Sequence, residues 1–286
     1  MVLLSGHTGF LGSYIYKELM YKNISVNTIG RSSSDICFSF DKVIGDLKFY
    51  DLVIHAAGVA HLSNSSDKDF YKFNTEGTLN LLNSLEASKI PRCFVFISSV
   101  SVYGRTSGEL INEETILSAC DYYGQSKIEA EKLVINWCNK FKIKYLILRL
   151  PLIFGDNPPG NLGSMINSIK KRYYFNVGGG IAQRSIVLAS DVAKCIINAS
   201  NYGGVYNLTD GVNPSISQLS NYLAGIYGIN FVPNMPLILA KVLAKIGDLF
   251  PMPINSNKLS KLVNTLTFDD SKARNVFNWN PRPVVI

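Results

Sequence analysis

Runs of apolar, β-branched residues alternate with helix-like segments along the first half of the chain. In the helix-like segments, apolar residues recur every three or four positions, as on the buried face of a helix. The predicted strands are residues 2–5, 25–29, 43–44, 52–56, 93–98 and 145–150, and the predicted helices are residues 11–21, 67–88 and 123–140. This alternation is typical of βαβ units. We therefore expect an α/β fold of the Rossmann type, a doubly wound parallel sheet with helices on both faces.

The pattern changes after Gly155, where proline and glycine clusters at 157–160 and 178–180 interrupt regular structure. Two further strands, at 184–188 and 205–208, are predicted around a helix at 191–199. These elements are expected to return to the first domain. We therefore predict a dinucleotide-binding domain over residues 1–156 and a smaller, mainly substrate-binding lobe over residues 157–286.

The most apolar late segment, residues 236–250, is interrupted by Lys241, Lys245 and Asp248. Its helical periodicity predicts a helix packed into a core, and contact with a membrane surface is the alternative. No uncharged apolar stretch reaches the length of about 18 residues that a spanning helix needs. The N-terminal residues lack the basic region and cleavage site of a signal peptide, so we expect a cytoplasmic protein.

Composition narrows the class of ligand. Of the 286 residues, 47% are hydrophobic and 17% are charged, as in soluble globular proteins. The net charge of +7 comes from lysines and arginines spread along the chain, without a dense basic run. A polyanionic small ligand such as a dinucleotide explains that charge as well as nucleic acid does, and we expect no nucleic acid partner. Five scattered cysteines and three histidines form no metal-ligand pattern, so reduced thiols and no metal are expected.

A glycine-rich turn follows the first predicted strand and opens the first predicted helix. The sequence from Gly6 to Gly12 reads GHTGFLG, a GxxGxxG pattern. Glycines permit a tight turn, a close backbone approach to a pyrophosphate, and close packing of helix on strand. The amides at the start of the helix then bind the phosphates. The residues expected to line this part of a cofactor site are Gly6, Thr8, Gly9, Phe10, Leu11 and Gly12.

The end of the second strand bears on the choice between NAD and NADP. An NAD site usually has a carboxylate there for the ribose 2′-hydroxyl. Here Arg31 and Ser32 follow the strand and suit a 2′-phosphate, which favours NADP over NAD, unless Arg31 is only a solvated surface charge. Asp46 and Leu47 follow the predicted third strand, where a carboxylate can meet the adenine amino group. Asp35, nearby in sequence, leaves that assignment open.

Three residues form a candidate catalytic set. Tyr123 and Lys127 lie four positions apart and therefore share one helix face. A lysine cation there is expected to lower the phenol pKa, so that Tyr123 acts as general acid or base. Ser99 ends an apolar strand, and ligands bind at that end of strands in parallel sheets. Taken singly each is weak evidence, but together they predict an acid–base site that exchanges a proton with a substrate hydroxyl or carbonyl.

With these motifs, the chain resembles the extended short-chain dehydrogenases/reductases, in the group of nucleotide-sugar epimerases and dehydratases. The matching pieces run through nearly the whole chain in the family's order. They are Gly6–Gly12, Asp46-Leu47, DLVIHAAG at 51–58, Asn74 with Gly77-Thr78, SSVSVYG at 98–104, Tyr123–Lys127, RLPLIFG at 149–155, RSIVLASD at 184–191, VYNLTD at 205–210, and DSKA at 270–273 with Trp279. The family's active hydroxyl precedes the closing glycine by five residues, which selects Ser99 before Gly104.

The resemblance implies further roles. Cofactor contacts are implied for Ala56, Ala57, Gly58, Asn74, Leu152 and Ile153. Asn161 and Arg184 would hold the diphosphate of a sugar nucleotide, and Ser101 and His61 would line the sugar pocket, although His61 is equally well explained as a packed loop residue. The helices at 67–88 and 123–140 would pair across a homodimer or, alternatively, only pack on their own sheet.

The reaction stays open between two chemistries. Family dehydratases carry an acidic pair just after the active hydroxyl, whereas this chain has Val100 and Ser101, so a dehydratase is not expected. One option is a 4-ketoreductase or 4-dehydrogenase of a UDP-linked deoxy-amino sugar, resembling the quinovosamine dehydrogenases of polysaccharide synthesis. The other is a 4-epimerase of the UDP-galactose type with tightly held NAD. A non-catalytic NADP-binding sensor is the alternative from another class.

Overall fold

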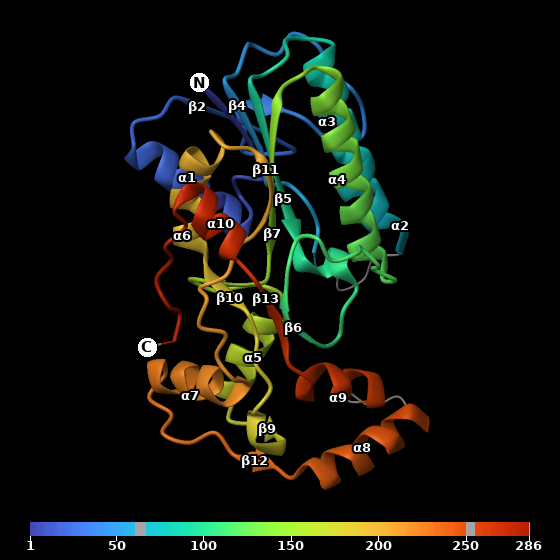
Figure 1. Ribbon diagram of the computed structural model, residues 1–286, viewed down its shortest axis with the longest axis vertical. Coiled ribbons are helices and arrows are strands. Elements are labelled where there is room, and N and C mark those ends of the chain that lie inside the picture. Colours follow the sequence, from blue (N-terminus) through green and yellow to red (C-terminus); the bar gives the residue numbers. More distant parts are fainter. Residues whose placement is uncertain (61–66, 250–254, 286) are drawn as a thin grey trace.

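A computed structural model describes residues 1–60, 67–249 and 255–285, and its centre is one seven-stranded sheet (Figure 1). All its strand pairs are parallel, in the order β11-β7-β5-β4-β1-β2-β3. The strands are β1 (Val2–Ser5), β2 (Val26–Gly30), β3 (Ile36–Cys37), β4 (Leu52–His55), β5 (Cys93–Ser99), β7 (Lys144–Leu150) and β11 (Gly204–Asn207). The expected Rossmann-type sheet is confirmed. The predicted third strand at 43–44 is wrong, because residues 36–37 pair with β2 instead.

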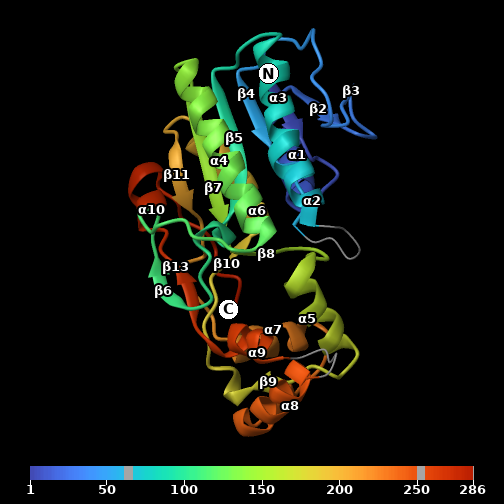
Figure 2. The same cartoon turned by 90° about the vertical axis from the view of Figure 1, so that its right-hand side faces the viewer.

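Helices cover both faces of this sheet, as Figures 1 and 2 show. One face is covered by α1 (Phe10–Tyr21), α6 (Ala189–Ala199) and α10 (Ser271–Phe277), and the other by α3 (Gly77–Glu86) and α4 (Tyr122–Lys140). Successive strand residues alternate between the two cores; Leu4 packs with the first set and Leu3 with the second. The predicted helix at 67–88 is α2 (Asp67–Phe70), a π-helical turn η1 (Tyr71–Glu76) and α3.

The smaller lobe lies beyond one end of the sheet (Figure 2). The third hydrophobic core of the protein lies in this lobe and joins α5 (Gly160–Lys170) to α7 (Ile216–Ile226). Short parallel pairs link β8 (Leu152–Phe154) to β10 (Ile186–Leu188), β9 (Asn176–Val177) to β12 (Asn234–Met235), and β6 (Gly108–Ile111) to β13 (Leu266–Phe268), with 3-10 turns η2 (Val100–Tyr103) and η3 (Gly178–Gly180). One expectation needs correction here: β10 pairs with β8 rather than joining the large sheet. Trp279, late in the chain, packs in the first core.

The late apolar segment forms α8 (Leu237–Leu249), followed by α9 (Ser256–Val263). The expected core packing is confirmed only for the small residues of α8, and its large apolar residues are exposed. Its buried residues are Ala240 and Ala244, whereas Ile238 and Leu249 are 80% and 81% exposed. Periodicity identified the helix but not which of its faces turns inward. Among the described helices, none is both long and apolar enough to cross a bilayer.

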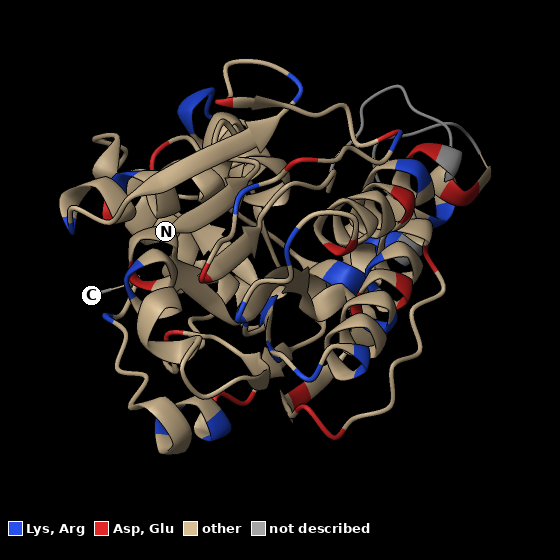
Figure 3. Cartoon of the chain, turned by 90° about the horizontal axis from the view of Figure 1, so that it is seen from above, with Lys and Arg blue, Asp and Glu red and all other residues tan. Residues whose placement is uncertain are grey.

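Charged residues of both signs are scattered along the chain in the view of Figure 3. On α4, Lys132 pairs with Glu129 on the exposed surface. The spread agrees with the absence of a dense basic run in the sequence. The described residues contain no cluster of histidine, cysteine and carboxylate side chains suited to a metal ion.

Candidate active site

The carboxyl ends of β1, β4 and β5 meet where the sheet order reverses. From β1 the sheet continues through β2 to β3, and from β4 it continues through β5 to β7. The chain leaves β1 into α1 on one face and leaves β4 towards α3 on the other. A crevice at such a switch point is where open parallel sheets bind their ligands. The predicted site residues can be located relative to it.

The glycine turn has the geometry of a dinucleotide cradle. Gly6 has φ of 75°, and a Cβ on it would lie 2.5 Å from the backbone nitrogen of Ala57. A Cβ on Gly12 would lie 1.9 Å from the carbonyl oxygen of Gly6, so α1 starts against the turn only because this residue is glycine. Gly9 is the N-cap of α1 and supplies no side-chain cap. The first amides of the helix therefore fit a pyrophosphate.

Other residues of the turn divide between surface and core. Thr8 is exposed at the start of α1. Leu11 is buried in the first core, so only its backbone amide faces a ligand. The Phe10 ring packs edge-on against Tyr14, whose hydroxyl accepts a hydrogen bond from the Asp156 backbone at 2.7 Å. This contact fixes the loop after β8 beside the glycine turn.

At the end of β2, Arg31 and Ser32 are exposed. The Arg31 guanidinium lies 5.4 Å from the centre of the Phe73 ring, a cation–π distance. The nearby carboxylate of Asp35 is turned back along the strand, because its Oδ2 accepts from both the backbone and the hydroxyl of Thr28. These bonds hold the pKa of Asp35 below its usual value. The end of β2 therefore presents a cation rather than a carboxylate.

The structure does not bring Asp46 and Leu47 to the crevice. The Leu47 amide donates to Ser88, beyond the carboxyl end of α3, and its side chain is buried in the second core. That end of α3 leads into the start of β5, so this segment lies at the amino ends of the strands, away from the crevice at their carboxyl ends. The residue near the crevice is Phe40, whose carbonyl accepts from Asn80. The expected adenine contact is corrected because the third strand ends at Cys37, not at 44.

Below the crevice, His55 at the end of β4 forms a directed chain of hydrogen bonds. Thr78 Oγ1 donates its proton to the Asn74 carbonyl and therefore accepts from His55 Nε2 at 3.0 Å. In the neutral imidazole Nδ1 is then the acceptor, and Ser5 Oγ, which accepts from the Ala57 amide, donates to it at 2.6 Å. Burial, aided by the Lys127 charge, lowers the pKa of His55 to about 3. This role of His55 was not predicted, although the histidine lies in the DLVIHAAG segment.

The loop after β4 is held by Asn74, on η1. Its Oδ1 accepts from the Val59 amide, and its Nδ2 donates to the Val59 carbonyl and to Ser126 Oγ. With these bonds made, the side chain positions the loop and is not free for the cofactor contact expected of it. A Cβ on Gly58 would lie 3.1 Å from Asn74 Oδ1 and 3.2 Å from Lys127 Nζ. The loop therefore runs directly past the lysine.

The structure brings together Ser99, Tyr123 and Lys127. Ser99 ends β5, and its hydroxyl accepts from the Ser101 amide at 3.2 Å. Tyr123 lies in the first turn of α4, with the Ser99 hydroxyl close enough to act on the pKa of its phenol. The approach depends on Gly124, where a Cβ would lie 2.8 Å from the Ser101 carbonyl. The helix N-cap Asp121 accepts from the Gly124 amide and fixes where α4 begins.

The pKa of Tyr123 differs from the expectation that a neighbouring lysine lowers it. Burial raises the pKa of Tyr123, and the hydrogen bond with Ser99 opposes that rise. The net pKa is thus raised rather than lowered, and the Lys127 ammonium is directed towards β5, where its Nζ donates to the Ile97 carbonyl at 2.9 Å and lies 4.7 Å from the Phe96 ring centre. Burial lowers the pKa of Lys127 to about 8, against the opposing charge of Glu131. At neutral pH the pair is a protonated phenol beside an ammonium group.

A buried ionic network lies behind this pair. Glu131 follows Lys127 by one turn of α4 and forms a two-point ion pair with Arg149, at 2.7 and 3.1 Å. Its Oε1 also accepts from Ser98 at 2.6 Å. Arg149 donates further to the Tyr103 hydroxyl, which donates to Asn207 on β11. The network ties α4 to β5, β7 and β11. The four-residue spacing from Tyr123 to Lys127 to Glu131 was the signal available in the sequence.

The remaining predicted site residues are those expected at the sugar nucleotide and at the nicotinamide. Ser101 is hydrogen-bonded to Ser99. Asn161 is exposed in the first turn of α5. The N-cap of this helix is Pro159, which makes no side-chain capping hydrogen bond. Leu152 and Ile153 lie in β8, directly after β7. His61 lies outside the described residues.

Arg184 is engaged by the C-terminal part of the chain. Its guanidinium donates to the backbone carbonyls of Gln183, Lys261 and Asn264. Burial lowers its pKa, and no salt bridge to it occurs within the described residues. A half-buried cation held only by carbonyl oxygens favours an anionic ligand beside it.

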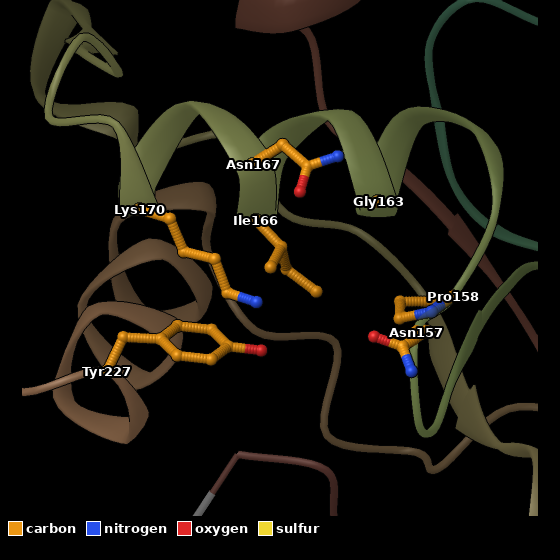
Figure 4. A pocket seen from close by; sticks show the side chains of 7 residues that line it. All are labelled: Asn157, Pro158, Gly163, Ile166, Asn167, Lys170 and Tyr227. Atoms are coloured by element: carbon orange, nitrogen blue, oxygen red, sulfur yellow. The ribbon is translucent and has the colours of Figure 1, made fainter.

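A small groove runs beside α5 (Figure 4). Asn157, Asn167 and Lys170 line it together with Tyr227, and Lys170 Nζ lies 4.2 Å from the centre of that ring. None of its lining residues belongs to the set of Ser99, Tyr123 and Lys127. We therefore place the reaction at the strand ends and not in this groove.

The comparisons with known proteins agree with this geometry. The profile of the NAD dependent epimerase/dehydratase family matches residues 2–208. UDP-glucose 4-epimerase of Vibrio cholerae is 25% identical over 304 aligned residues, covering 98% of this chain and 90% of that protein. N-acetyl-alpha-D-glucosaminyl-diphospho-ditrans,octacis-undecaprenol 4-epimerase of Escherichia coli O157:H7 is 26% identical, covering 76% of this chain and 70% of its own.

Solved structures share the fold over nearly the full length. UDP-glucose 4-epimerase of Thermotoga maritima superposes with a TM-score of 0.76 at 19% identity, covering 98% of this chain and 93% of that one. At that identity the likeness concerns the fold alone. The family profile covers well over half of the chain, and with it the glycine turn, Ser99, Tyr123 and Lys127. The protein is therefore an enzyme of the NAD dependent epimerase/dehydratase family.

Proposed function

We propose that the protein catalyses NADP- or NAD-dependent oxidoreduction at C4 of a nucleotide-activated sugar, as a 4-ketoreductase or 4-dehydrogenase of a UDP-linked deoxy-amino sugar for polysaccharide synthesis. The observation that carries the proposal is the convergence of Ser99, Tyr123 and Lys127 beside the Gly58 loop. A dinucleotide held at its pyrophosphate by the glycine turn would supply or accept the hydride through its nicotinamide. Residues 157–286 would form most of the sugar-binding lobe, with Asn161 and Arg184 at the diphosphate.

The protonation state of the pair supports the reductive direction. Tyr123, its pKa raised by burial, keeps its proton at neutral pH and can donate it to a carbonyl oxygen. Ser99 is placed to donate a hydrogen bond to the same oxygen. The Lys127 charge stabilises the phenolate that the proton transfer leaves behind, although it does not create a phenolate beforehand.

We expect kcat/KM for reduction to fall as the pH rises past about 8. The pKa of Lys127 is about 8, so above that pH the amine loses the charge that stabilises the phenolate. The parameter kcat/KM reports groups of the free enzyme, which is the state that the structure describes. Initial rates between pH 6 and 10 test this. A profile that stays flat through pH 9 contradicts the assigned role of Lys127.

NADP is proposed as the preferred cofactor because Arg31 is exposed at the end of β2, where Asp35 is turned away. Replacing Arg31 by alanine should raise KM for NADPH about tenfold or more, the loss of one charge-assisted hydrogen bond. KM for NADH is the internal control and should change little, because NADH lacks the 2′-phosphate. An equal change for both cofactors would place Arg31 outside the ribose site.

A 4-epimerase with retained NAD is the second candidate. The relatives of Vibrio cholerae and E. coli are both named as 4-epimerases, which favours it. The same acid–base pair serves both chemistries, but an epimerase must oxidise and then reduce the same sugar. A lipid-linked diphospho-sugar, as named for the E. coli relative, belongs in the same assays because a diphosphate is common to both carriers.

The deciding experiment has two arms. The first measures oxidation of NADPH by the purified protein with a UDP-4-keto-6-deoxy sugar. The second follows interconversion of UDP-glucose and UDP-galactose, and of their N-acetylated forms, without added cofactor. Turnover in the first arm with no retained nucleotide supports the reductase, and turnover in the second with NAD released on denaturation supports the epimerase. Absence of turnover in both, with NADP bound, supports a sensor.

Assembly and location complete the proposal. We propose a homodimer in which α3 and α4 pair with their copies, in the cytoplasm where nucleotide sugars are made. Light scattering on the purified protein measures the mass, and a monomer of 31.6 kDa at micromolar concentration would contradict the dimer.

A further inference from the structure

The helix α8 is amphipathic, but its large apolar residues face solvent instead of the protein interior. Ile238, Val242 and Leu249 share one face, at spacings of four and seven residues, and all three are exposed. The opposite face carries Ala240 and Ala244, which pack against Leu259 of α9 in a small core. Small residues thus face the protein and large apolar residues face solvent. Figures 1 and 2 show α8 at the end of the molecule farthest from α3.

Cations border this apolar face. Lys241 and Lys245 are exposed and lie one turn apart along its edge. Asp248 is the one acidic residue between positions 211 and 264, a stretch that contains four lysines. Its carboxylate accepts from the backbone and hydroxyl of Ser256 at the start of α9, so its charge is directed at that helix end. The outer surface is therefore apolar in its centre and positive at its rim.

Charge favours a bilayer over a second copy as the occupant of this face. Pairing α8 with another α8 across a two-fold axis would bring Lys241 and Lys245 of both copies together. An anionic membrane instead buries the apolar side chains among acyl chains while the lysine stems reach up to the headgroups. Leu262, 43% exposed on the adjoining helix, and Lys261 beside it extend the same pattern.

We propose that the outward face of α8, with the exposed edge of α9, docks the enzyme peripherally on an anionic lipid bilayer. The helix lies in the plane of the interface and does not cross it. The docked element is connected to the sugar lobe, because Arg184 donates to the Lys261 and Asn264 carbonyls at the end of α9. Docking thereby places the diphosphate side of the site near the membrane surface. The proposal does not depend on which sugar reaction the enzyme catalyses.

The test is co-sedimentation of the full-length protein with vesicles, which needs no turnover. One set of vesicles is phosphatidylcholine, and the other is phosphatidylcholine with phosphatidylglycerol at about 7:3. We expect binding to the anionic set that weakens as salt rises, since lysines near an anionic surface contribute electrostatically. Replacing both Lys241 and Lys245 by glutamate should weaken it at least about tenfold. The charge-matched control, Lys17→Glu with Lys89→Glu, should bind as the native protein does.

A second variant tests the apolar half of the face. Ile238→Ser with Leu249→Ser should also reduce binding, whereas Ile116→Ser, at a residue 78% exposed elsewhere, should not. Both serine variants are at exposed positions, so circular dichroism should show native folding. Equal binding of native protein and variants, or no binding to anionic vesicles, overturns the proposal. So does a loss of dimer mass in Ile238→Ser with Leu249→Ser, which would assign the face to a second copy.

Discussion

Replacing Tyr123 by phenylalanine is expected to lower kcat by about 10²–10⁴-fold, the usual contribution of a positioned acid–base group. The variant keeps the ring, which packs 5.9 Å from Phe70 between ring centres, so the local packing is preserved. What is lost is the proton that the buried phenol donates to the substrate oxygen. Steady-state kinetics with the active substrate pair measure the effect.

The neighbouring tyrosine provides a matched control. Tyr122 is the first residue of α4 and is 47% exposed, and its hydroxyl is assigned no role in the site. Tyr122→Phe should retain native kcat, and both variants should bind the dinucleotide with native affinity in a fluorescence titration. A Tyr123→Phe enzyme with native kcat would falsify the proposed chemistry.

Removal of Glu131 by alanine substitution should lower the free energy of unfolding by about 3–5 kcal/mol, the cost of leaving one partner of a buried ion pair alone. The Glu131 and Arg149 side chains are 2% and 6% exposed. Without the carboxylate, the guanidinium remains buried with the Tyr103 hydroxyl and the Glu113 carbonyl as partners. Urea unfolding followed by circular dichroism at pH 7 measures the change.

The control for this variant lies on the same helix. Glu129 pairs with Lys132 at 2.9 Å on the surface, and exposed pairs contribute about 0–1 kcal/mol. Glu129→Ala should therefore unfold close to the native midpoint. Glu131→Gln, which keeps one accepting oxygen but loses the charge and the second acceptor, should fall between the two. Equal small losses in Glu129→Ala and Glu131→Ala would mean that the network does not fix α4 against the sheet.

The sequence pattern was sufficient for the main sheet and its helices because strands such as β1 and β4 are continuous buried apolar runs and the helices are long enough to show their period. It was insufficient for β3, which has two residues, too few to show any period. It also could not tell which face of α8 turns inward. Alanines with large apolar neighbours give the same periodicity in either orientation, and only tertiary contacts decide.

The candidate site could be predicted as far as local spacing determines position. Tyr123 and Lys127 share a helix face by geometry alone, and the glycine turn is a local motif. Asp46 was misplaced because its position depends on where β3 ends. The pairing of Glu131 with Arg149 links two elements 18 residues apart, and the direction of the Lys127 ammonium, towards Ile97, depends on β5. Neither follows from spacing within one helix.

The directed chain through His55 has a practical consequence for kinetics. Nε2 donates to Thr78 and Nδ1 accepts from Ser5, so a second ring proton would have to displace the hydrogen that Ser5 directs at Nδ1. The imidazole therefore stays uncharged at any pH suited to an assay, in accord with its pKa of about 3. Ionisations that appear in a pH–rate profile near neutrality therefore belong to other groups of the enzyme, and His55 contributes no pKa to the fit of that profile.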